Sequence, residues 1–297
     1  MTSVSRSASP KASRSAAPRR RVISGRSSWT YALLAPFLLF FTLPLYWMLI
    51  TAFKQDQDLY DLSAFPLWYS MAPTLEHFDY LFQDTLFPQW ALNSAIIAVV
   101  VTAITLALSI PAAYALARFK MRGAKYFTIG IFLAYLLPPT LLFLPLSQVV
   151  VFLGLQDSIW SLIVMGPTRT VPFAVWLLLG YFRTLPGELE EAARVDGCNR
   201  FTALVRIILP ISIPGVLTTV FFTVALTIQE FVYPLTFISS SSSRPVSIGV
   251  ATDLVRGDVF FWQSLTAGAL LVGLPVALAY AFFMDKFVQG ITAGAIK

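Results

Sequence analysis

The sequence ELEEAARVDGCNRFTALVRIILPISIP, residues 188–214, is the most polar long segment in the second half of a strongly apolar chain. Its early glutamates place negative charge beside the positive end of a helix dipole, and Gly197 is a typical residue for a helix to end at. Asn199 is suited to cap a second helix. The apolar residues of this second helix recur at the spacing of a single face: Phe201, Leu204, Val205 and Ile208. The segment therefore predicts a short helix ending near Val195, a glycine elbow and an amphipathic helix, although local physics alone explains an ordinary pair of surface helices equally well.

The composition around this segment is that of a membrane protein. Of the 297 residues, 57% are hydrophobic and 12% are charged, whereas soluble domains carry about 25% charged residues. The chain is therefore predicted to be all-α, polytopic and embedded in a lipid bilayer. Its basic residues flank apolar runs and do not alternate with aromatic residues on a polar domain, so we expect no nucleic-acid partner.

The chain offers little chemistry of its own. Cys198 is the only cysteine and His77 the only histidine, which excludes a disulfide within the chain and a zinc cluster. We interpret both residues as incidental. No nucleotide-binding loop or nucleophile elbow is present, so we expect no catalytic residue, metal or cofactor, and ATP and Mg²⁺ would have to be bound by a partner chain.

Apolar runs of about 20 residues are long enough to cross a bilayer. Six are predicted to do so: 31–50, 91–117, 126–146, 159–182, 211–233 and 262–284. Pro138-Pro139 interrupts the third run, where we expect a break and then a short helix at the outer surface.

The charges around these runs predict the orientation of the chain. Residues 1–28 are basic, contain no acid and are expected to form a disordered cytoplasmic tail before the membrane domain, residues 29–297. By the positive-inside rule both termini and the loop 183–210 are cytoplasmic, and the loops 51–90 and 234–261 are external. The prolines and aromatic residues of the first external loop predict that it is folded.

The polar segment carries a recognisable motif in this context. Glu191-Ala192-Ala193, three residues, Gly197, nine residues, Ile207, one residue and Leu209-Pro210 match the EAA loop of ATP-binding cassette (ABC) importer permeases at each defining position. From about Pro36 onward the chain resembles the shorter permease of the maltose-type carbohydrate subfamily. The supporting stretches are Leu43-Pro44, Phe53-Lys54, Asn93-Ser94, the run from Ala113 to Arg118, Leu137-Pro138-Pro139 and the run from Gln289 to Lys297. One stretch departs from that pattern: residues 228–231 read Ile-Gln-Glu-Phe where these permeases often carry Trp-Asn-Glu-Phe, which puts the usual sugar in doubt.

This resemblance implies a type I importer permease in a bacterial cytoplasmic (inner) membrane. It implies a heterodimer with a second permease subunit, a dimer of ATPase subunits below and an extracytoplasmic solute-binding protein outside. The residues that it assigns to ATPase coupling are Glu191, Ala192, Ala193, Gly197, Ile207, Leu209 and Pro210, and the tail 289–297 would also reach that interface. Within the external stretch 239–258 it assigns contact with the binding protein to Ser240, Ser241, Ser242 and Arg244. A solvated, serine-rich linker is the alternative for that stretch.

Ionisable residues inside a membrane are costly and therefore informative. Arg169 lies about ten residues into the fourth predicted span, roughly 15 Å deep at 1.5 Å per residue, and Pro167 and Pro172 around it predict an irregular helix. Arg169 either lines the translocation path and meets an anionic or hydroxyl-rich substrate, or forms an ion pair with Glu230. Further candidates for the pathway are Gln229, Glu230, Tyr233 and Asn93, with hydrogen bonding between helices as the alternative role.

The resemblance favours a di- or oligosaccharide or a sugar derivative as the solute, and Arg169 leaves room for an acidic or phosphorylated one. A secondary transporter or facilitator that does not use ATP is the alternative function. Such proteins usually show internal repeats and acids at mid-membrane, whereas Glu230 is the only acid within a predicted span and is placed near its outer end.

Overall fold

The computed structural model describes residues 26–61, 63, 65–119, 121–256 and 259–284. The predictions for residues 1–25 of the basic tail and for the tail 289–297 lie outside these described residues. The chain divides into two compact units, Met1–Tyr46 and Trp47–Lys297. The helix α1 (Arg26–Phe53) begins in the first unit and ends in the second. Its part in the first unit presents apolar side chains such as Phe40, which is 72% exposed, as expected of a helix that faces lipid.

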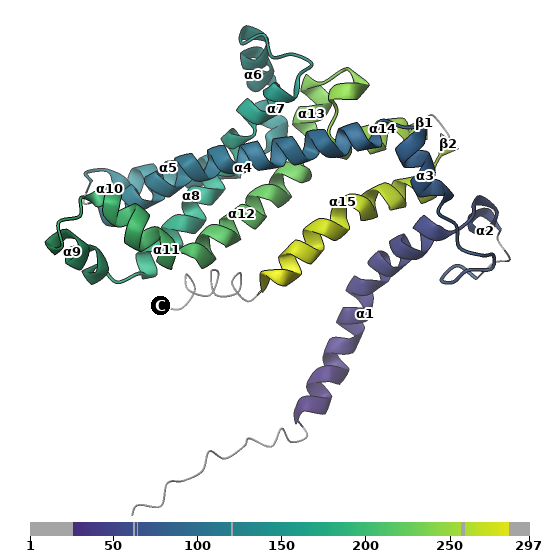
Figure 1. Cartoon of the computed structure of the whole chain (residues 1–297), viewed down its shortest axis with the longest axis horizontal. Coiled ribbons are helices and arrows are strands. Elements are labelled where there is room, and N and C mark those ends of the chain that lie inside the picture. Colours follow the sequence, from purple (N-terminus) through teal and green to yellow (C-terminus); the bar gives the residue numbers. More distant parts are fainter. Residues whose placement is uncertain (1–25, 62, 64, 120, 257–258, 285–297) are drawn as a thin grey trace, which may run out of the picture. The chain divides into compact units, whose positions relative to one another are not determined.

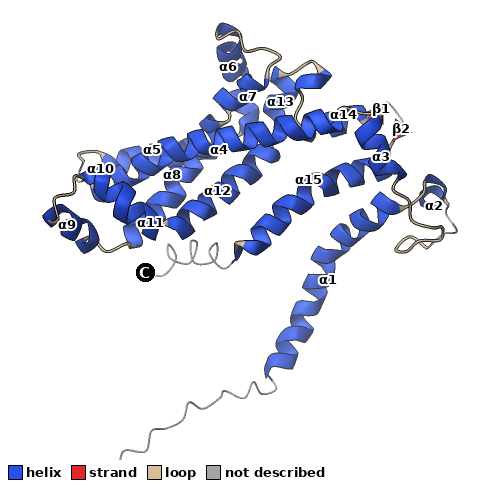
Figure 2. Cartoon of the chain, viewed as in Figure 1, coloured by secondary structure: helices blue, strands red, loops and turns tan. Residues whose placement is uncertain are grey.

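The second unit is built around four helices that lie side by side (Figure 1): α4 (Phe87–Arg118), α5 (Ala124–Leu136), α8 (Pro167–Thr184) and α12 (Ile213–Ile228). The last long helix is α15 (Trp262–Phe282). Figure 2 shows that the described chain is almost entirely helical. Four of its helices are long and apolar enough to cross a membrane, and six spans result if each of two bent pairs counts as one. The predicted all-helical membrane fold is therefore confirmed.

The third predicted span, 126–146, is not one straight helix. α5 ends at Leu136, and α6 (Pro139–Phe152) leaves it at an angle of 96°. The break falls at the predicted prolines, because Pro138 is held in an extended conformation and Pro139 begins the new helix.

The fourth and fifth spans differ in detail from the prediction. The irregular stretch expected between Pro167 and Pro172 is wrong: α8 is helical through it, and the interruption is at Gly166, after α7 (Ile159–Met165). Pro167 fits because it occupies the first helical turn, where its missing N–H has no partner to lose. The fifth span ends at Ile228 and not at Tyr233, which lies in a separate helix, α13 (Val232–Phe237).

The predicted external loop, residues 51–90, is folded, as expected. It contains α2 (Asp56–Tyr60) and α3 (Glu76–Gln83), and its core includes Leu81 and Trp90, both 0% exposed. Lys54 and Asp58 form a buried ion pair at 3.8 Å. His77 is not incidental, because its Nε2 lies 2.8 Å from the buried carbonyl of Lys54 and its side chain helps to hold the lobe together.

The second external stretch packs on the same core. It consists of a short 3₁₀ turn (Ser241–Ser243), α14 (Val246–Asp253) and a small antiparallel pair of strands, β1 (Val255–Arg256) and β2 (Val259–Phe260). α14 lies so close to α4 that a Cβ added at Gly249 would be 2.3 Å from the Trp90 ring. The serine-rich segment is thereby mounted on the outer end of α4.

Candidate functional site

The predicted coupling segment, residues 183–210, folds as a pair of short helices around an elbow. α9 (Glu188–Val195) is followed by Gly197 at φ +86°, a left-handed conformation that suits glycine, and then by α10 (Arg200–Ala203). The predicted cap is present, because Asn199 Oδ1 accepts a hydrogen bond from the Thr202 amide at 2.8 Å. α11 (Leu209–Ile211) ends the segment, which meets α12 at 80°.

The residues of the matched motif occupy different environments in this segment. Ala193 is 2% exposed and packs inward, whereas Glu191, Ala192 and Pro210 face outward. Ile207 and Leu209 are half-buried. The structure therefore places the candidate coupling residues on one segment but does not give them one common surface.

The predicted single apolar stripe of the second helix is wrong. Leu204 and Ile208 are buried, but Phe201 is 72% and Val205 45% exposed. Phe201 lies in α10, before a π-helical turn over Leu204–Ile208. Because the 3.6-residue period is lost in that turn, the residues on its two sides do not form one regular stripe. Two apolar side chains consequently face away from the core, and Val195 at the end of α9 is 88% exposed beside them in sequence.

The coupling segment is attached to the end of α4 by polar contacts that sequence reasoning missed. Arg118 Nη2 donates to the Leu185 carbonyl at 2.9 Å, and Arg118 Nε lies 3.8 Å from Glu190 Oε2. The Arg200 guanidinium stacks 4.5 Å from the centre of the Phe119 ring. In sequence Arg118 indicates only the cytoplasmic side, because nothing local pairs it with a glutamate in a distant loop.

The outer serine loop is anchored to the opposite end of α4. Asn93 Nδ2 donates to the carbonyls of Ser242 and Arg244 at 2.8 and 2.9 Å, and Trp90 Nε1 donates to the Ser241 carbonyl at 2.7 Å. Asn93 thus makes its hydrogen bonds from α4 to the serine loop and not to another membrane-spanning helix, and it does not line the cavity described below.

A second anchor, Asp157, was not identified from sequence. Its Oδ1 accepts hydrogen bonds from the Ser240 amide (2.7 Å), the Ser240 hydroxyl (2.9 Å) and the Ser239 amide (2.9 Å). These contacts, those of Ser240 first, lower the pKa of the Asp157 carboxyl below its ordinary value. The loop is therefore held in place and is not the solvated linker of the alternative interpretation.

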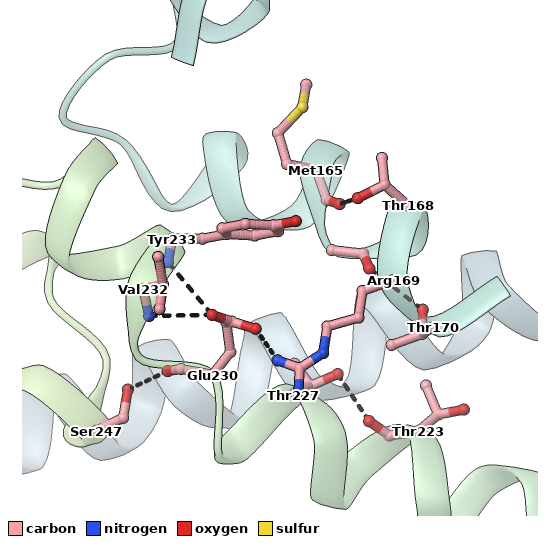
Figure 3. Close-up of polar contacts among 11 residues, drawn as sticks. Met165, Thr168, Arg169, Thr170, Thr223, Thr227, Glu230, Val232, Tyr233 and Ser247 are labelled. Atoms are coloured by element: carbon pink, nitrogen blue, oxygen red, sulfur yellow. Dashed lines mark hydrogen bonds and ion pairs between the residues drawn. The ribbon is translucent and has the colours of Figure 1, made fainter. Parts of the chain in front are cut away.

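The predicted ion pair is formed between α8 and the link that follows α12 (Figure 3). Arg169 Nη1 makes an ion pair with Glu230 Oε2, and the two side chains are 30% and 13% exposed. Glu230 Oε1 accepts from the amides of Val232 and Tyr233 at 3.0 and 3.3 Å, which caps the start of α13. Of the two alternatives for Arg169, the ion pair is the geometry that the structure shows. Glu230 itself lies in the link after α12 and not within the span.

A narrow cavity adjoins this pair. Its volume is about 30 Å³, and its lining includes Arg169, Thr170, Glu230 and Tyr233. About 10–15 Å³ of such volume accommodates one water molecule, so the cavity has room for about two and not for a sugar. Gln229 is exposed and does not line it. Among the described residues, no group of three or more His, Cys, Asp and Glu side chains is arranged to hold a metal ion.

Comparison with known proteins identifies the family of the chain. Residues 106–293 match the family described as "Binding-protein-dependent transport system inner membrane component". The chain is 32% identical to the inner membrane ABC transporter permease protein YcjP of Escherichia coli, over 90% of this chain and 95% of that protein. It is also 32% identical to the sulfoquinovosyl glycerol transport system permease protein SmoH of Agrobacterium fabrum, over 86% and 88%.

A solved structure shows the same fold. A chain of a bacterial ABC transporter involved in the import of the acidic polysaccharide alginate superposes with a TM-score of 0.75 at 19% identity, covering 94% of this chain and all of that one. The chain therefore belongs to the family of binding-protein-dependent transport system inner membrane components, and it is a permease with the type I ABC importer fold.

Proposed function

We propose that this chain is one of two permease subunits of an ATP-driven importer for a sugar or a sugar derivative. It would form a heterodimer with a second permease, bind a dimer of ATPase subunits at its cytoplasmic face and receive solute from an extracytoplasmic binding protein. The observation that carries the proposal is the helix–elbow–helix segment α9–α11, which exposes apolar side chains between two membrane spans.

The exposed side chains of this segment support ATPase docking. Val195, Phe201 and Val205 face away from the core of a segment that the charge pattern places in the cytoplasm. Exposed apolar side chains on a polar element suit a protein–protein contact. The candidate coupling residues Glu191 to Pro210 belong to this segment, and ATP and Mg²⁺ would be held by the partner ATPase.

The attachment of the segment supports transmission of motion. Glu190 on α9 pairs with Arg118 at the end of α4, so a displacement of α9 pulls on a helix of 32 residues, or roughly 48 Å at 1.5 Å per residue. The outer end of the same helix carries Asn93 and, through it, the serine loop. Ser240, Ser241, Ser242 and Arg244 would there meet the binding protein.

The class of solute is supported by relatives. One is named for sulfoquinovosyl glycerol, and the solved importer is described for alginate. Both are sugar derivatives, which agrees with the subfamily resemblance of the sequence. A thermal-shift screen of the cognate binding protein against neutral and acidic sugars would identify the solute.

Reconstitution tests the proposal. The chain is co-expressed with its partner permease and ATPase, and the complex is reconstituted into vesicles. Binding protein is added outside the vesicles, and uptake of labelled disaccharides is measured. We expect uptake only with ATP on the ATPase side. Uptake by this chain alone under an ion gradient would instead establish the secondary transporter or facilitator.

A further inference from the structure

Glu230 joins the elements that meet at the outer end of the fifth span. α12 ends at Ile228 and α13 begins at Val232, so the link between them lacks the continuous hydrogen bonding of a helix. The Glu230 carboxylate occupies the amides of Val232 and Tyr233, and the Glu230 carbonyl accepts from the Ser247 hydroxyl of α14 at 2.9 Å. One residue therefore connects α12, α13 and α14.

Arg169, the partner of Glu230, lies on a tightly packed part of the fourth span. Arg169 lies in the first turn of α8, directly after Gly166. A Cβ at Gly166 would lie 2.8 Å from the Leu162 carbonyl and 3.0 Å from the Val101 side chain of α4, which shows how tightly the fourth span packs there. Thr170 is also bound to α4, with its hydroxyl 2.6 Å from that of Thr105.

The pair closes the space between these two supports. Arg169 and Glu230 form the charged wall of the cavity of about 30 Å³, whose other walls come from α4, α7, α12 and α13. Figure 3 shows the guanidinium of Arg169 turned toward the carboxylate of Glu230 across the gap between α8 and the link. Nothing larger than about two water molecules fits there while the pair is formed.

We infer that the Arg169–Glu230 pair is a latch that holds the outer end of the fifth span against the fourth in the resting transporter and separates when the transporter opens outward. Glu230 acts as the positioning residue of this closure. The inference rests on the proposed importer function. The partial exposure of both side chains, 30% and 13%, suits a reversible contact, because separating the charges returns them to water and does not leave them buried without a partner.

The variant Glu230→Gln tests the latch cleanly. Its amide oxygen still accepts from the amides of Val232 and Tyr233, so the cap of α13 is kept while the charge is removed. Loss of the latch shifts the population away from the closed state. In the purified complex without binding protein, we expect phosphate release from ATP to rise by about 5- to 30-fold, because losing about one or two kcal/mol of stabilisation changes a two-state population ratio by that factor.

Two further variants complete a cycle. Arg169→Gln breaks the same contact and should raise the rate similarly, and the double variant should add nothing to either single one. The control is Asp253→Asn, which breaks the Arg244–Asp253 pair (3.9 Å, side chains 20% and 27% exposed) at the end of α14 opposite to Ser247. It should leave the rate unchanged, and the melting temperature of each complex checks that it is folded.

The latch is overturned if Glu230→Gln leaves phosphate release at the wild-type rate. It is also overturned if Arg169→Gln abolishes uptake without raising phosphate release, since Arg169 would then contact the solute. The proposed function itself would be rejected if the wild-type chain bound no ATPase. If the wild type couples ATP hydrolysis to uptake and the variants couple them equally well, only the latch is rejected.

Discussion

At the scale of the residue, the most important positions are Gly197 and Glu230. At each of them a single side chain, or the lack of one, determines the path of the backbone. Gly197 adopts φ +86°, which costs an L-residue about 1–2 kcal/mol. Glu230 caps α13 and pairs with Arg169 at the same time. Both positions belong to patterns visible in sequence, but their local roles follow from backbone geometry.

The elbow gives a direct prediction. Gly197→Ala should strain the turn between α9 and α10 and weaken binding of the ATPase by about fivefold, which corresponds to ~1 kcal/mol. Titration of the ATPase onto the permease pair in detergent measures this. The matched control is Gly187→Ala in the same loop, because Gly187 has φ −66° and open space where a Cβ would be added. Equal binding by both variants would show that the elbow is not needed for docking.

The Arg118–Glu190 contact gives a second prediction at this scale. Glu190→Gln removes the charge beside Arg118 but leaves the exposed apolar residues of the coupling segment in place. We expect ATPase binding to be retained while uptake per ATP hydrolysed falls severalfold, because the pull on α4 is weakened. Both quantities are measured in the same vesicles. Equal loss of binding and uptake would mean that Glu190 belongs to the docking surface.

At the scale of the element, the outer serine loop is shaped by its two anchors and not by its own sequence. Asn93 of α4 holds its centre, and Asp157, at φ +54°, holds its start while its own amide donates to the Phe237 carbonyl at 2.9 Å. Serine-rich composition alone indicates flexibility, so the order of this loop depends on residues far away in the chain.

The pH dependence of this loop follows from the Asp157 carboxyl. Hydrogen bonds lower its folded pKa below the ordinary value of 3.8, so the stabilisation is present above that value and is lost as pH falls through the folded pKa. A spin label on Ser242→Cys, in a Cys198→Ser background, should be immobile from neutral pH down to the ordinary pKa of 3.8 and become mobile only as the pH falls further. Asp157→Asn should remove this transition. A transition that persists in Asp157→Asn would assign it to another group.

At the scale of the whole molecule, α4 connects the two functional ends of the second unit. Its inner end contacts the coupling segment through Arg118, and its outer end contacts the serine loop through Asn93 (Figure 1). Helices α8 and α12 pack along it between these ends. The arrangement predicts that the coupling segment and the serine loop face opposite sides of the membrane.

The single cysteine makes this orientation measurable. Cys198 is partly exposed beside the elbow, so a membrane-impermeant maleimide should label it in inverted vesicles and not in intact cells. Ser242→Cys in a Cys198→Ser background should show the reverse pattern. Labelling of Cys198 from outside would overturn the proposed topology.

The sequence by itself determined the membrane class, the approximate positions of the apolar spans, the break at Pro138-Pro139, the elbow at Gly197 and the family. These features depend on hydropathy, on backbone restrictions of proline and glycine and on local spacing, all of which act over a few residues. Only the tertiary structure decided the Arg118–Glu190 and Arg169–Glu230 pairs, the anchoring by Asp157 and the outward-facing Phe201. The reason is that the contacts join residues distant in the chain, and that the exposure of Phe201 depends on how its helix packs, neither of which local spacing encodes.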